Sequence, residues 1–99
     1  MIFFEDYSKL KNGFFSLIRQ NADFYKLDDI YPIWGMGNTF KQDSKAKLWN
    51  TYRIKRINIT ERFVSANITC TKEELIKKLD VRYGKEFDDF VVLQFKKVV

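Results

Sequence analysis

The sequence predicts an α+β fold in which helices pack on one face of an antiparallel sheet. Three observations support this: strict alternation over residues 45–56, a helix-capping pattern at 71–74, and a nearly continuous apolar run at 90–95. We expect a sheet of three or more strands and two or three helices, in the order roughly α-β-β-α-β. The 99 residues are 45% hydrophobic and 17% aromatic. That composition suits one core, so we expect a single domain over residues 1–99.

Residues 3–20 are expected to form the first helix. Apolar side chains such as Phe3, Leu10 and Phe14 recur there at intervals of three or four residues, the spacing of an amphipathic helix. The pair Asn12-Gly13 interrupts this stripe and is also a turn signal. Two shorter helices, or a short strand followed by a helix, are therefore the alternatives.

The next segment has little periodicity and is interpreted as a long loop. Pro32 and two glycines within three residues favour irregular structure, so residues 31–41 are expected to form a loop that contains Trp34. Loops of this length in small domains are often functional. The glycines do not make a dinucleotide fingerprint, because Phe40 occupies the position of the third glycine.

Residues 45–56 are expected to form a strand with one apolar and one basic face. The even-numbered positions are mainly apolar and suit a core. The odd-numbered positions place cations around a tryptophan: Lys45, Lys47, Trp49, Arg53 and Lys55. After Arg56 the apolar phase changes, with Ile57 and Ile59 as the next apolar pair, which predicts a bulge or bend there.

The remaining elements follow from alternation and capping. Residues 64–70 alternate and predict a second strand, paired with the first as an antiparallel hairpin. Thr71 followed by Glu74 forms a capping box, so a helix is expected to begin there. Residues 81–87 are expected to be its exit loop. The apolar run at 90–95 predicts a central strand that is covered on both faces.

The inventory of reactive side chains excludes most catalytic and metal chemistry. The chain has no His and one Cys, Cys70. It therefore lacks the residues for most zinc sites, for a Ser-His-Asp triad, for a Cys-His dyad and for an internal disulfide. The carboxylates occur as adjacent pairs, which on a strand point to opposite faces and form no converging dyad. We expect no catalytic residue, no metal and no cofactor.

The length of the apolar runs and the charge of the first residues indicate where the protein is located and whether it enters a membrane. No apolar stretch approaches the roughly 18 residues that span a bilayer. The N-terminal residues carry acids where a signal peptide carries positive charge. We expect a cytoplasmic protein that does not enter a membrane.

One enzyme class does not need His. In size, charge and mix of elements the chain is similar to small ribonucleases of the RelE-like toxin type, although no residue motif carries the resemblance. The resemblance implies that Arg, Lys and Tyr side chains would position the 2′-hydroxyl and stabilise the phosphorane. The corresponding candidates are Tyr52, Arg53, Lys55, Arg56 and Tyr83.

The net charge of +5 is confined to one segment. Residues 41–60 hold six Lys or Arg and one Asp, which accounts for the whole excess. Such a localised charge is typical of an electrostatic footprint for a partner. Partner-binding residues are therefore sought on the predicted basic face, namely Lys45, Lys47, Trp49, Arg53 and Lys55, with Trp34 of the 31–41 loop. The alternative is a solvated sheet face whose lysines discourage edge pairing.

These observations predict a non-enzymatic module that binds another macromolecule. The leading hypothesis is a small inhibitor of the toxin-immunity, antitoxin or phage-inhibitor kind, which covers an acidic or phosphate-binding surface on a partner protein. Cationic rim residues would steer association and the tryptophans would anchor it. The rival hypothesis is a nucleic-acid-binding domain that uses the same face for phosphate contacts and base stacking.

Overall fold

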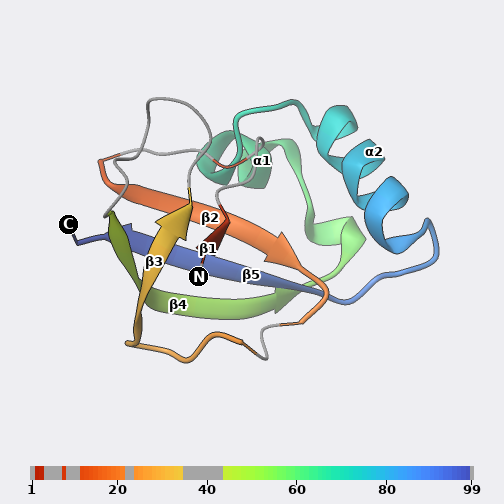
Figure 1. Ribbon diagram of the computed structural model, residues 1–99. Coiled ribbons are helices and arrows are strands. Elements are labelled where there is room, and N and C mark those ends of the chain that lie inside the picture. Colours follow the sequence, from red (N-terminus) through yellow and green to blue (C-terminus); the bar gives the residue numbers. More distant parts are fainter. Residues whose placement is uncertain (1, 4–7, 9–11, 22–23, 35–43, 99) are drawn as a thin grey trace.

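A curled sheet with two helices on one face forms the structure (Figure 1). The computed structural model describes residues 2–3, 8, 12–21, 24–34 and 44–98. The strands are β1 (Ile2–Phe3), β2 (Phe14–Arg19), β3 (Ile30–Trp34), β4 (Lys45–Ile54) and β5 (Phe90–Lys97), in the spatial order β1-β3-β4-β5-β2. The pair β1/β3 is parallel and the other pairs are antiparallel.

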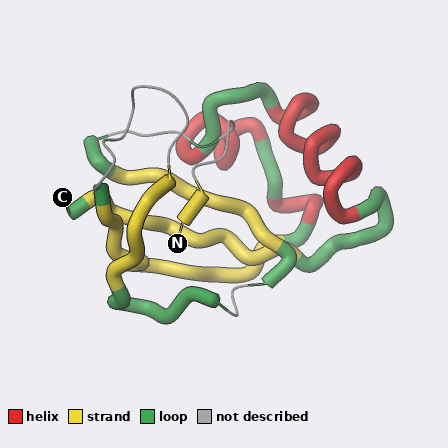
Figure 2. Tube along the Cα trace, in the orientation of Figure 1, coloured by secondary structure: helices red, strands yellow, loops and turns green. Residues whose placement is uncertain are grey.

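The α+β class is confirmed, whereas the predicted order of elements is wrong. Four strands come first, followed by the 3₁₀ turn η2 (Arg56–Asn58), α1 (Glu61–Asn67), α2 (Lys72–Tyr83) and then β5. The last strand returns to the middle of the sheet between β4 and β2, as Figure 2 also shows. The expectation of a central strand over 90–95 is therefore confirmed.

The helix predicted over residues 3–20 is wrong, because residues 14–19 form β2. Asn12 and Gly13 both have positive φ, 54° and 82°, so the Asn-Gly pair is a turn that leads into the strand. Leu17 is buried on one face of β2 and Ile18 on the other. A strand buried on both faces reads as an unbroken apolar run, which here coincided with helical spacing. Residues 4–7 and 9–11 lie outside the described residues.

The predicted 31–41 loop is also partly wrong, because its first residues belong to β3. Tyr31 pairs with Ala46 and Pro32 with Lys45 of β4, while Ile33 pairs with Ile2 of β1. The remainder of that segment, residues 35–41, lies outside the described residues.

The strand and hairpin predicted for residues 64–70 are wrong, because α1 occupies residues 61–67. Thr60 is its N-cap, and the Thr60 hydroxyl accepts a hydrogen bond from the Phe63 backbone N–H at 3.2 Å. Val64 and Ile68 are buried at a spacing of four residues, whereas the intervening Ala66 is exposed. The apolar positions therefore follow the helical period, with alternation only apparent.

The capping pattern at 71–74 is confirmed. The Thr71 hydroxyl accepts a hydrogen bond from the Glu74 backbone N–H at 3.2 Å and lies 3.1 Å from the Glu74 carboxylate. These contacts cap the first turn of α2. The helix continues to Tyr83 and ends at Gly84, whose φ is 90°. The predicted exit loop of 81–87 is therefore wrong over its first three residues.

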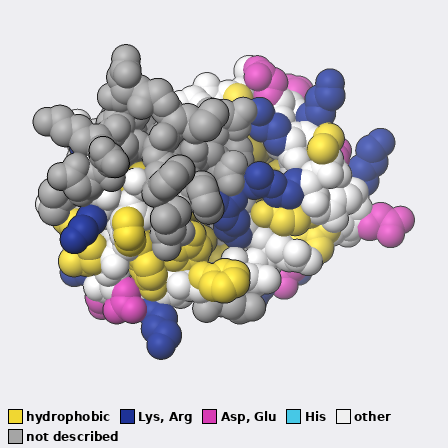
Figure 3. Space-filling model, viewed as in Figure 1, with side chains coloured by type: hydrophobic (Ala, Val, Ile, Leu, Met, Phe, Trp, Pro, Cys, Tyr) yellow, Lys and Arg dark blue, Asp and Glu magenta, His cyan; other side chains and the backbone are white. Residues whose placement is uncertain are grey.

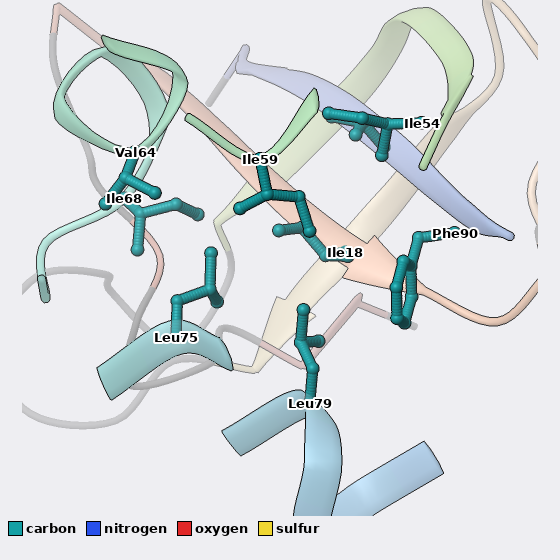
Figure 4. Packing of buried hydrophobic residues seen from close by; sticks show 9 residues of the cluster. Ile18, Ile54, Ile59, Val64, Ile68, Leu75, Leu79 and Phe90 are labelled. Carbon is teal, nitrogen blue, oxygen red and sulfur yellow. The ribbon is translucent and has the colours of Figure 1, made fainter. Parts of the chain in front are cut away.

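Both faces of the sheet are buried in part, each by its own cluster of apolar side chains. The helix-side cluster packs the helices, together with Ile59 after η2, against β2, β4 and β5, and it includes Val92. Figure 4 shows its labelled members pointing toward one another: Ile18, Ile54, Ile59, Val64, Ile68, Leu75, Leu79 and Phe90. The inner cluster lies on the other face, where the sheet curls and β1 and β3 complete it: Ile2, Phe15, Leu17, Ile33, Ala46, Leu48, Val91, Leu93 and Phe95.

Arg56 ties η2 to the end of α2. Its guanidinium lies 2.7 Å from the Asp80 carboxylate and donates to the backbone carbonyls of Gly84 at 2.7 Å and Phe87 at 2.6 Å. It also lies over the Phe90 ring, 5.3 Å from the centroid. Arg56 is thus committed to holding the fold at the helical end of the sheet.

Candidate functional site

A bulge in β4 decides where the predicted basic face lies. Leu48 pairs with Phe95 and Asn50 with Gln94, so Trp49 is one extra residue on β4. Directly opposite residues in an antiparallel ladder point to the same face. Leu48 therefore shares a face with Phe95 in the inner cluster, whereas Asn50 and Gln94 face the helix side.

The bulge splits the predicted face in two. Lys47 lies opposite Lys96, on the face that carries the helices. Arg53 lies opposite Val91, on the face of the inner cluster. The even-numbered positions are split in the same way, since Leu48 and Ile54 belong to different clusters. The single alternating face predicted over 45–56 is therefore wrong, because the phase already changes at Trp49. The bend predicted after Arg56 is confirmed, since η2 follows β4 there.

The two cations beyond the bulge meet an acid. Arg53 lies 3.1 Å and Lys55 4.0 Å from the Asp89 carboxylate. All three side chains are about half exposed or more, so these pairs contribute little to stability. They do reduce the positive charge that Arg53 and Lys55 present to a partner.

The helices cover only part of their face of the sheet, and the uncovered part we call the open face. Four residues directly opposite one another cross it as a row, Ile30 on β3, Lys47 on β4, Lys96 on β5 and Phe14 on β2. Lys45 precedes Lys47 by two residues on the same face of β4, further from the helices, and its backbone carbonyl accepts a hydrogen bond from the Val98 N–H. Trp49 lies on the side of the row that is nearer to α1. The open face is thus Phe14, Ile30, Lys45, Lys47, Trp49, Lys96 and Val98.

The open face is both apolar and basic. Its large apolar side chains remain unusually accessible, with exposed fractions of 39% for Phe14, 55% for Ile30 and 45% for Trp49. The Phe14 and Trp49 rings meet edge to face at 5.8 Å. Figure 3 shows hydrophobic side chains gathered over the sheet and a mixture of basic and acidic ones around the helical end.

Lys47 and Lys96 occupy directly opposite positions, an arrangement that destabilises a sheet. Two contacts moderate the repulsion. The Lys47 ammonium lies 3.6 Å from the Asp28 carboxylate, and the Lys96 ammonium lies 5.7 Å from the Phe14 ring centroid. Local features that cost stability are commonly found at functional sites, so this pair is informative about function.

A hollow of about 240 Å³ opens between the open face and α1. Phe14 and Trp49 form its aromatic wall, Ala66 lies on its helical side, and polar side chains complete its lining: Asn12, Ser16, Asn67 and Gln94, beside Phe15.

The amides beside the hollow form a hydrogen-bonded chain whose orientation is determined by one backbone carbonyl. The Asn67 Nδ2 donates to the Phe63 carbonyl at 3.0 Å, which leaves its Oδ1 to accept from Gln94 Nε2 at 3.3 Å. Gln94 Oε1 must then accept, and Asn50 Nδ2 donates to it at 2.8 Å. The Ser16 hydroxyl also donates to Asn67 Oδ1 at 3.0 Å. Each amide orientation therefore follows from its neighbour.

Trp34 ends β3, and its backbone pairs with Phe3 of β1. The candidates of the ribonuclease hypothesis do not converge. Tyr52 lies opposite Val92 on the helix side, so it and Arg53 point to opposite faces, and Arg56 is bound to Asp80. Burial raises the pKa of Tyr52 above its ordinary value of 10.0.

Several residues of the site were not predicted to belong to it from the sequence. Phe14 was assigned to a helix, and Ile30, Lys96, Asn67 and Gln94 lie in different segments that only the strand pairing brings together. The one local signal was the lysine that directly follows the apolar run of β5.

No protein-family model matches the chain, and no curated protein or solved structure matches it. Among the described residues, no three or more His, Cys, Asp or Glu side chains are grouped so that they could hold a metal ion. No helix in the described part of the chain has both the length and the apolar character to cross a membrane.

Proposed function

We propose that the protein is a binding module that docks its open face on an acidic surface of a partner protein and covers that surface. The observation that carries the proposal is the cross-strand row in which Lys47 and Lys96 lie side by side between exposed Ile30 and Phe14. An exposed apolar surface bordered by polar side chains is typical of an interaction site.

The composition of the open face favours protein over nucleic acid. Its cations are all lysines, whereas arginine is the residue that matches phosphate with two parallel hydrogen bonds. The Lys96 ammonium lies over the Phe14 ring, and the Trp49 ring packs edge to face against it. Phe14 therefore does not present an uncovered ring face on which a base could stack. An exposed tryptophan packed beside a second aromatic ring is instead typical of an interface hot spot.

Binding would be steered by charge and anchored by apolar contact. Lys45, Lys47 and Lys96 would attract an acidic partner over a distance of about 8–10 Å at physiological salt. Trp49, which is 45% exposed, would supply the buried anchor. Occlusion of the partner's site is the predicted mechanism of an inhibitor of the toxin-immunity, antitoxin or phage-inhibitor kind, and cytoplasmic action suits such a role.

The test is capture of a partner by the tagged protein from cells of its natural host, followed by native mass spectrometry. We compare wild type with Lys45→Glu/Lys96→Glu and with a matched control, Lys77→Glu/Lys85→Glu. The control makes the same charge change at exposed positions on α2 and in the loop after it. We expect one acidic protein in a stoichiometric complex with wild type and with the control, and at least a tenfold loss with the open-face variant.

Equal capture by both variants contradicts the proposal. Retention of nucleic acid, with affinity falling log-linearly in salt by about 0.7–0.9 per phosphate contacted, favours the rival hypothesis instead. A protein complex that persists in nuclease and at moderate salt excludes that hypothesis.

A further inference from the structure

The hollow beside α1 is too small for a typical small-molecule site. Its volume of about 240 Å³ lies below the roughly 300–1,000 Å³ of pockets that enclose drug-sized ligands. It is open to solvent beside Trp49 and Phe14, both of which are part of the open face. The hollow has room for one side chain inserted from a docked partner.

The amide chain beside the hollow has donors to spare. Asn67 Oδ1 already accepts two hydrogen bonds, from Ser16 and Gln94, and Gln94 Oε1 accepts one from Asn50. Each amide nitrogen carries two hydrogens. One hydrogen on Gln94 Nε2 and one on Asn67 Nδ2 have no acceptor among the described residues. An occupant that brings an acceptor atom can therefore meet these donors.

The surrounding charge favours an acceptor that is negative. Lys96 lies over the Phe14 ring that lines the hollow, and Lys47 lies directly opposite Lys96. Hydrogen bonds to an ionised acceptor are about twice as strong as those between neutral groups. The aromatic wall suits an aliphatic stem, so a side chain with a short apolar stem and a carboxylate at its tip fits best.

We propose that this hollow receives a glutamate side chain of the acidic partner, whose carboxylate accepts hydrogen bonds from Gln94 and Asn67. The inference rests on the proposed function, since it names a further contact that the partner makes within the same docked face. It assigns the amide chain a role in recognition: the Phe63 carbonyl orients Asn67, Asn67 orients Gln94, and the two together present N–H groups to one carboxylate.

The test uses a single-residue probe and the protein's own side-chain signals. N-acetyl-glutamate N-methylamide is titrated into the labelled protein, while the side-chain NH₂ resonances of Gln94 and Asn67 and the Trp49 indole N–H are followed. We expect a saturable shift of these signals with a Kd on the order of millimolar. The neutral isostere, N-acetyl-glutamine N-methylamide, should bind at least about tenfold more weakly.

A variant that fills the hollow without touching its hydrogen bonds provides the structural control. Ala66 is exposed on α1 and lines the hollow, so Ala66→Leu should occupy it and keep the fold, since Leu is a good helix former. Ser65→Leu is the matched variant, because Ser65 is exposed on the same helix and does not line the hollow. We expect Ala66→Leu to abolish the shifts and Ser65→Leu to leave them.

The inference is overturned by equal binding of the two probes, by unmoved Gln94 and Asn67 signals at saturation, or by wild-type binding by Ala66→Leu. A deoxythymidine oligonucleotide that moves the same signals more strongly than the glutamate probe also overturns it. Failure of this inference can be told apart from failure of the docking proposal, because the docking proposal is tested by a different variant, Lys45→Glu/Lys96→Glu. If Ala66→Leu keeps the partner and the charge variant loses it, the hollow does not receive a partner side chain, whereas the docked face remains supported.

Discussion

Deleting Trp49 should leave the protein folded, although removing one residue from a central strand ordinarily moves every later side chain to the wrong face. In β4 the residues on either side already match the regular alternation, since Leu48 faces the inner cluster and Asn50 faces the helix side. With Trp49 removed, the two become neighbours in an ordinary ladder. Ile54 keeps its place in the helix-side cluster.

The cost of the deletion follows from what Trp49 buries. A fully buried aromatic side chain removes about 150–250 Å² from water. Trp49 is 45% exposed, so it buries roughly 100 Å², which at about 25 cal/mol per Å² amounts to about 2.5 kcal/mol. The edge-to-face pair with Phe14 adds about 1 kcal/mol, and recovery of regular pairing offsets part of the loss. We expect a net loss of about 3 kcal/mol, against a total stability of about 5–15 kcal/mol.

The measurement is urea unfolding followed by far-ultraviolet circular dichroism. Trp49→Ala keeps the bulge and loses nearly the same side chain, so the deletion should lie within about 1 kcal/mol of it. Deletion of Ser16 is the control, because β2 shows no register shift against β5 and Phe14 and Phe15 would exchange faces. That control should be unfolded. If the Trp49 deletion unfolds as the Ser16 deletion does, the assignment of faces around the bulge is refuted.

Three further predictions concern the contacts around the two ends of the sheet. Arg56→Met should lower the free energy of unfolding by about 3 kcal/mol, which is the lower end of the cost of breaking a buried ion pair, because the Arg56 and Asp80 side chains remain 20% and 24% exposed. Urea unfolding measures this loss, and a value under about 1 kcal/mol would contradict the prediction. Lys96→Glu should change stability by no more than about 1 kcal/mol, since the new attraction to Lys47 and the cation–π attraction to Phe14 that it replaces are of similar size, and any increase in stability should shrink in high salt. Partial burial holds the pKa of Tyr52 above 10.0 in the folded state, so the unfolded chain loses its proton first and stability should fall as pH rises above about 10. Tyr52→Phe should show less of this fall between about pH 9 and 11, and an identical fall would argue against the raised pKa of Tyr52.

The sequence was informative where a local pattern had only one structural interpretation. The Thr71–Glu74 cap begins α2, and the apolar run of 90–95 is a central strand. The same reasoning misassigned β2, whose Leu17 and Ile18 are buried on opposite faces and so do not alternate with polar residues. It misassigned α1, where Val64 and Ile68 satisfy both a two-residue and a four-residue period.

The site depended on pairing that no local pattern contains. The alternation of β4 correctly predicted a strand, but the bulge at Trp49 depends on which residues of β5 lie opposite. That one extra residue separates Lys47 from Arg53, although both stand at odd-numbered positions. Lys96 and Phe14 join Lys47 only because the last strand inserts between β4 and β2. Such pairings between distant segments are set by the tertiary fold.

The most direct test of the docked open face is photo-crosslinking in cells of the natural host. p-Benzoyl-phenylalanine replaces Ile30, which is 55% exposed on the open face, or Val81, which is 84% exposed on α2. Both positions are accessible, and neither change removes a lysine or Trp49. We predict a single crosslinked protein from position 30 and none from position 81. Crosslinks of equal yield from both positions, or crosslinks to nucleic acid from position 30, would contradict the account.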